Sequence, residues 1–98
     1  MSTIGAHSRP ALAPGTRLET DRVTGEPVLL SPEGITHLNE TARAIVTQCD
    51  GRRTIEEIVA ALAAEYDAPA EAMRGDVIGC LAELAEKKLI VIPDHGPF

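Results

Sequence analysis

The stretch CDGRRTIEEIVAAL at residues 49–62 constrains the fold most strongly, because it ends one helix and starts another. Glycine accepts the left-handed backbone that a helix C-terminus often requires, so Asp50-Gly51 predicts a helix end. Thr54 and Glu57 have the spacing of a capping box, in which each side chain accepts an amide that the new helix leaves unpaired. The chain is therefore expected to turn a sharp corner between two helices, as in a helix-turn-helix unit.

Helical periodicity continues on both sides of this corner. Asn39 is a favourable N-cap for a first helix that runs to Cys49, with apolar residues recurring every three or four positions. The second helix is interrupted at 67–69, where a proline suits the first turn of a further helix. The third helix is expected from about Ala70 to Lys88. Its predicted core stripe consists of Met73, Val77, Cys80, Leu81 and Leu84.

The first third of the chain has the pattern of short strands separated by turn residues. Strands are predicted at 16–21, 28–30 and 35–38, with turns at 22–26 and 31–34. Three strands cannot form a stable unit alone and need helices packed against one face. The order of the segments predicts an α+β domain of winged helix-turn-helix type, with a three-stranded antiparallel sheet followed by three helices.

The 98 residues are enough for one domain. Residues 1–15 are rich in turn formers and lack apolar periodicity, which predicts a flexible N-terminal arm. The domain is expected over 16–92, closing with a short extended segment at 89–92. Residues 93–98 read as a C-terminal tail.

The charge balance argues against nucleic acid as a partner. The chain has 15 acidic and 9 basic side chains, for a formal net charge of −6, whereas nucleic-acid affinity comes mostly from neutralising phosphates. The helix after the predicted corner carries Glu56, Glu57 and Glu65 and no basic residue. No apolar run approaches the roughly 20 residues that span a bilayer, and the N-terminus lacks the apolar region of a signal peptide. We therefore expect no membrane association and a cytoplasmic location.

No arrangement of residues predicts catalysis, a metal or a cofactor. Cys49 and Cys80 each lie within an apolar helical pattern, which favours small buried thiols over a disulfide. The histidines His7, His37 and His95 are isolated from one another in sequence. There is no glycine-rich phosphate loop and no nucleophile elbow. We expect neither catalytic residues nor an enzyme.

A binding module is the function class that remains, and two features favour it. The third strand is short and can lie at the sheet edge with unpaired backbone groups. The third helix carries a second apolar flank, formed by Ile78, Ala82 and Ala85. Together they can form a groove that takes an extended peptide as an added strand. The alternative is that this flank packs against the sheet or against a second subunit, giving a structural homodimer.

The ordered set of motifs over residues 16–92 resembles the PqqD family, the small peptide-carrier proteins of pyrroloquinoline quinone biosynthesis. The motifs that carry this resemblance are Arg17-Leu18, Val28-Leu29-Leu30, Pro32-Glu33, Asn39, Thr41-Ala42, Cys49-Asp50-Gly51, Thr54, Glu57-Ile58, the helix end at 62–66, Val77, Leu81 and Leu84. The chain departs from the family pattern at three positions. Pro27 replaces a common aromatic, Asn39 replaces an acidic residue, and Lys88 replaces a glycine before the last apolar segment.

The resemblance implies a peptide chaperone. It would bind the precursor peptide whose Glu and Tyr side chains become pyrroloquinoline quinone. It would then present this peptide to the radical S-adenosylmethionine enzyme that cross-links those two side chains. The implied peptide site is the groove between the third strand and the third helix. Its residues would be Ile35, Thr36, His37, Leu38, Val77, Ile78, Leu81, Ala82 and Ala85. Candidate salt contacts to partners are Arg17, Arg52, Arg53, Lys87 and Lys88. The alternatives are a peptide-recognition module of another modified-peptide pathway and a winged-helix transcription regulator.

Overall fold

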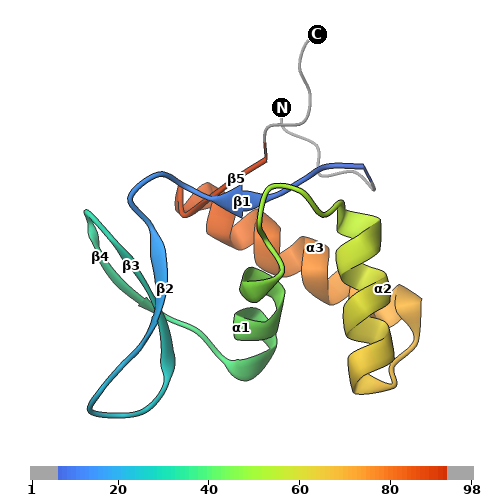
Figure 1. Ribbon diagram of the computed structural model, residues 1–98, viewed down its shortest axis with the longest axis horizontal. Coiled ribbons are helices and arrows are strands. Elements are labelled where there is room, and N and C mark those ends of the chain that lie inside the picture. The colour runs from blue at the N-terminus through green and yellow to red at the C-terminus, as the bar shows by residue number, and fades with distance from the viewer. Residues whose placement is uncertain (1–6, 93–98) are drawn as a thin grey trace, which may run out of the picture.

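The computed structural model describes residues 7–92 as a small mixed domain (Figure 1). In Figure 1 the antiparallel sheet lies to one side, α1 lies between the sheet and α2, and α3 runs behind them. The elements are β1 (Ala11–Leu12), β2 (Arg17–Thr20), β3 (Pro27–Ser31), β4 (Gly34–His37), α1 (Glu40–Thr47), α2 (Ile55–Tyr66), α3 (Ala70–Glu86) and β5 (Ile90–Val91). The predicted α+β class, with a three-stranded antiparallel sheet followed by three helices, is confirmed.

The main sheet has the order β2-β3-β4. Pro27 begins β3, and its carbonyl accepts a hydrogen bond from the Leu38 N–H at 3.0 Å. A proline is tolerated in a central strand at this first position, where its missing amide interrupts the ladder least. Leu29 is fully buried and lies opposite Leu18 and Thr36 in the register, so this face of the sheet covers the helices.

The two helix starts predicted from polar residues are confirmed. Asn39 Oδ1 accepts the N–H of Ala42 at 2.7 Å at the start of α1. At the start of α2, the Thr54 N–H donates to Glu57 Oε1 at 2.8 Å, and the Glu57 N–H donates to Thr54 Oγ1 at 3.2 Å. This capping box fixes where α2 begins and hence the corner between α1 and α2.

The end of α3 places Lys88 in the left-handed region, with a φ of 65°. The Leu89 N–H donates to the Leu84 carbonyl and the Lys88 N–H to the Ala85 carbonyl, each at 2.9 Å. These two bonds form a Schellman motif, whose left-handed position is usually a glycine because any Cβ is strained there. Lys88 is one of the three positions at which the chain departs from the pattern of the family that it resembles, and this geometry favours a glycine there.

The core is aliphatic and lies between the helices and the inner face of the sheet. Its fully buried side chains include Leu29, Ile45, Ile55, Ile58, Val59, Leu62, Val77 and Leu81. Cys49 is buried among them as a free thiol, and burial raises its pKa to about 12. Cys80 is also free and half-buried. The expectation of a small buried thiol is therefore confirmed for Cys49, whereas Cys80 is less buried than expected.

The N-terminal segment differs from the flexible arm expected over 1–15. From residue 7 onward it packs on the domain, and Ser8 and Pro10 are buried. β1 pairs antiparallel with β5, and the Ala13 N–H donates to the Leu89 carbonyl at 2.9 Å. Two-residue strands are too short for alternation to reveal, which is why the sequence pattern missed this pairing. The predicted tail at 93–98 and the first six residues lie outside the described residues.

None of the helices within residues 7–92 has the length and apolar character needed to cross a bilayer.

Candidate peptide-binding groove

Strand β4 forms an open edge of the main sheet, because only β3 pairs with it among the described strands. The Leu38 N–H bonds to the Pro27 carbonyl, so even-numbered residues of this strand direct their backbone groups toward β3. Successive residues of an antiparallel strand alternate in this respect. Ile35 and His37 therefore direct their N–H and C=O groups to the open side. The edge offers two donors and two acceptors to an added strand.

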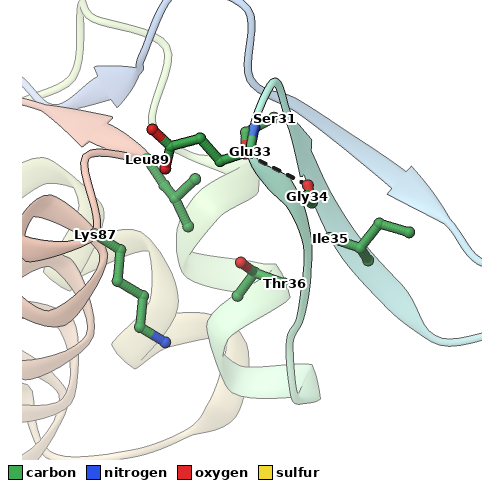
Figure 2. A pocket seen from close by; sticks show the side chains of 7 residues that line it. All are labelled: Ser31, Glu33, Gly34, Ile35, Thr36, Lys87 and Leu89. Atoms are coloured by element: carbon green, nitrogen blue, oxygen red, sulfur yellow. Dashed lines mark hydrogen bonds between the residues drawn. The ribbon is translucent and has the colours of Figure 1, made fainter.

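The side chains of β4 point to opposite faces of the sheet. Figure 2 shows Thr36 directed toward the end of α3 and Lys87, whereas Ile35 points to the other side. Ile35 is 61% exposed, so its side chain is free to contact a partner. His37 shares the outward face with Ile35 and is also exposed.

A hollow of about 320 Å³ separates the tip of the β3–β4 hairpin from the end of α3 (Figure 2). Its lining residues are Ser31, Glu33, Gly34, Ile35, Thr36, Lys87 and Leu89. The Ser31 side chain shapes the turn, because its Oγ accepts the Glu33 N–H at 3.3 Å and donates to the Gly34 carbonyl at 3.4 Å. The hollow thus has a fixed hairpin on one side and a helix end on the other.

A second hollow, of about 330 Å³, lies where β4 gives way to α1 and faces the middle of α3. Its lining residues are Asn39, Thr41, Ala42, Ile45, Asp76, Cys80 and Glu83. The pKa of the Cys80 thiol is raised, first by burial and second by the nearby charge of Glu83. Both cysteine thiols are therefore protonated at neutral pH and are poor nucleophiles.

The two hollows share one face of α3, which carries Asp76, Cys80, Glu83 and Lys87. We call this set the mixed stripe. Its members are spaced four, three and four residues apart, so they lie along one side of the helix. The β4–α3 groove is defined here as the open edge of β4, the two hollows and the mixed stripe. It is acidic at Asp76, and the Glu83–Lys87 ion pair lies toward its other end.

Some of the predicted site residues lie in this groove and others do not. Ile35 and Thr36 line the first hollow, His37 contributes its backbone to the edge, and Leu38 packs against the core. Val77 and Leu81 are 0% exposed and belong to the core, so they line neither hollow, and their contact with peptide stays a prediction. The remaining predicted helix positions, Ile78, Ala82 and Ala85, line neither hollow.

The sequence reasoning missed the mixed stripe because it searched α3 for a surplus of apolar residues. The wall of the groove is instead a row of charged and small polarisable side chains, adjacent to the apolar row that faces the core. The signal in the sequence was the position of Glu83, directly before the core residue Leu84, and of Lys87, four residues after Glu83. This spacing places both side chains on the side of α3 next to its core-facing row.

An α+β domain with an unpaired strand edge beside a helix belongs, by its geometry, to the modules that can take an extended peptide by strand addition. The comparisons agree with this class. The family model for coenzyme PQQ synthesis protein D (PqqD) matches residues 26–90. The chain belongs to the PqqD family.

Relatives and solved structures extend the match over nearly the whole chain. The "PqqA binding protein" of Xanthomonas oryzae pv. oryzae (strain KACC10331 / KXO85) is 42% identical over 90 residues, covering 92% of this chain and 98% of that protein. The solution structure of the PqqD truncation of Methylobacterium extorquens PqqCD has a TM-score of 0.74 at 36% identity, covering 84% of this chain and 87% of that one. It is described as a functional, stand-alone recognition element of ribosomally synthesised and post-translationally modified peptides.

A more distant structure shares the fold. TbiB1, solved in complex with the TbiA(beta) leader peptide, has a TM-score of 0.70 at 24% identity, covering 89% of this chain and 99% of that one. At this identity the match shows the fold alone.

Proposed function

We propose that this protein binds the precursor peptide of pyrroloquinoline quinone and presents it to the radical S-adenosylmethionine enzyme that cross-links it. The open edge of β4 is the observation that carries the proposal, since Ile35 and His37 direct unpaired backbone groups toward the β4–α3 groove. Membership of the PqqD family supports the peptide assignment, as does the name of the Xanthomonas relative.

The chemistry of the groove fits an extended peptide. Backbone hydrogen bonds to Ile35 and His37 would hold any strand in register, whatever its side chains. Alternate side chains of that strand would then face α3. There the mixed stripe offers the carboxylate of Asp76 toward one end and the Glu83–Lys87 ion pair toward the other, so the groove can favour one direction of the peptide.

The proposed role is that of a carrier, with the covalent chemistry carried out by the enzyme. Within residues 7–92 no three histidine, cysteine, aspartate or glutamate side chains are grouped as metal ligands. The peptide is made on ribosomes, so the proposal places the encounter in the cytoplasm. A homodimer is a further possibility, which sedimentation at several protein concentrations would test.

Amide chemical shifts during a titration would test the peptide proposal. We expect the precursor peptide to shift the amides of 34–38 and those of the mixed stripe, with saturation at one peptide per chain. Duplex DNA and a peptide of the same composition in scrambled order serve as controls. Shifts with DNA alone would support a winged-helix regulator. Peptide-induced shifts confined to residues outside the β4–α3 groove would overturn the proposed site.

A further inference from the structure

Three exposed arginines lie together at the corner between α1 and α2. Arg52 and Arg53 come from the turn itself, and Arg9 comes from the N-terminal segment, 43 positions earlier than Arg52. The Arg9 Nε donates to the Arg52 carbonyl at 3.1 Å. We call these three residues the arginine corner. It exists only because the N-terminal segment crosses the turn.

The backbone that carries the arginine corner is held in place. The Gly51 N–H donates to the Pro10 carbonyl at 2.9 Å. Asp50 Oδ1 accepts the Arg52 N–H at 2.8 Å and the Arg53 N–H at 3.0 Å. These two bonds are the main reason that the pKa of Asp50 is lowered, and they keep its carboxylate directed at the turn. The three guanidinium groups are thus presented from a fixed base.

The other basic residues of the domain are mostly paired with carboxylates of the same chain. Ion pairs within 4.0 Å join Arg17 to Glu19, Arg43 to Glu40, Arg74 to Glu56 and Lys87 to Glu83. Over residues 7–92, no member of the arginine corner makes such a pair. Arg53 instead donates from Nη1 to the neutral Gln48 side chain at 2.6 Å. Of the five Lys and Arg residues that make no such pair within the described part of the chain, three therefore lie together at the corner, with the Asp50 carboxylate beside Arg53, on a chain whose net charge is −6.

The chemistry of the corner points to carboxylates as its ligand. A guanidinium is planar and binds a carboxylate through two parallel hydrogen bonds. Nucleic acid is a poorer fit, because the net charge of the chain repels a polyanion at a distance and three contacts give little compensation. A protein face with a few clustered carboxylates would meet the three arginines of the corner favourably, so electrostatics would also orient the encounter.

We propose that the arginine corner is the surface that docks an acidic face of the modifying enzyme, while the peptide occupies the β4–α3 groove. This inference rests on the proposed function. No residue of the corner lines either hollow of the groove. The two ligands would therefore bind at the same time, as a carrier requires.

A charge-matched pair of variants tests the proposal. The first variant is R9Q/R52Q/R53Q; the second is R22E/R43Q, which lowers the net charge by the same amount at exposed arginines elsewhere. The dissociation constant for the radical S-adenosylmethionine enzyme is measured with and without peptide, and that for the peptide is measured separately. We expect the corner variant to weaken enzyme binding by about tenfold or more, mainly through faster dissociation at physiological salt. Peptide affinity should stay within about twofold in both variants.

Several results would overturn the docking proposal. One is equal weakening by both variants, which would indicate a general charge effect. Another is unchanged enzyme binding by a folded corner variant, and a third is tight binding of duplex DNA that requires the corner. Failure of the wild-type protein to bind peptide would instead count against the proposed function, and enzyme binding without peptide would still decide the role of the corner. A lysine triple, R9K/R52K/R53K, keeps the charge and should restore only part of the affinity.

Discussion

The open edge of β4 and the arginine corner are built in opposite ways. At the corner, the backbone amides of Gly51, Arg52 and Arg53 are all satisfied within the chain, so only side chains remain for a partner. At the edge, Ile35 and His37 keep backbone donors and acceptors unpaired.

This difference implies two kinds of recognition. An open backbone accepts an extended chain with little regard to its sequence, and the adjacent helix face supplies the selection. A closed corner with three guanidinium groups recognises charge at fixed positions on a folded surface. One small domain can thus hold a flexible peptide and a folded enzyme by different means.

Removing the N-terminal segment is the strongest test of the corner. Deleting residues 1–13 should lower the free energy of unfolding by about 2–4 kcal/mol, since about 1 kcal/mol is lost with each of several backbone hydrogen bonds and apolar contacts are lost as well. The bonds removed include those from Ile55 to Ser8, from Gly51 to Pro10 and from Ala13 to Leu89. Urea unfolding would measure the change.

A point variant distinguishes the loss of packing by the N-terminal segment from the effect of shortening the chain. Leu12 packs against the core, so Leu12→Asp should reproduce part of the loss. Val23 is 92% exposed, and Val23→Asp should change stability by less than about 0.5 kcal/mol. A deletion as stable as the full chain would show that residues 7–13 form the flexible arm expected from the sequence.

A proline at the open edge tests the β4–α3 groove with a smaller effect. His37→Pro removes an outward N–H at the end of β4, and a peptide carbonyl then stays unpaired. The peptide dissociation constant should rise about tenfold, consistent with about 1–3 kcal/mol for an unsatisfied buried partner. Calorimetric titration would measure it.

The matched control for this variant is the neighbouring residue. Thr36 directs its backbone toward β3, so Thr36→Pro should break the β3–β4 ladder and lower stability itself. If His37→Pro folded normally and bound peptide as tightly as the wild type, strand addition on β4 would be wrong.

The sequence predicted the parts of the fold that depend on local chemistry. The capping box of Thr54 and Glu57, the Asn39 cap and the three strands of the main sheet all follow from residues close together in sequence. The pairing of β1 with β5 could not be predicted in this way, because it joins two-residue segments from opposite ends of the chain. Likewise, periodicity predicted the core-facing row of α3, and Met73, Val77, Leu81 and Leu84 of that row are buried. It could not show that the neighbouring mixed stripe lines the two hollows, since that depends on how α1 and β4 lie beside the helix.

Controls aside, Lys88→Gly should produce the smallest change in stability of the variants considered. Lys88 lies in the turn that joins α3 to β5. Glycine relieves the left-handed strain at a φ of 65°, so the free energy of unfolding should rise by up to about 1 kcal/mol. Lys88→Ala removes the same charge but keeps the Cβ, and should give no such gain. Asp67 ends α2 at a φ of 53°, and aspartate tolerates this region better, so Asp67→Gly should stabilise less. Urea unfolding of the three variants would rank them, and equal gains from glycine and alanine at position 88 would assign the effect to the lost charge. With the edge of β4 and the arginine corner unaltered, peptide and enzyme affinities should remain those of the wild type, which separates the stability of the domain from both of its recognition surfaces.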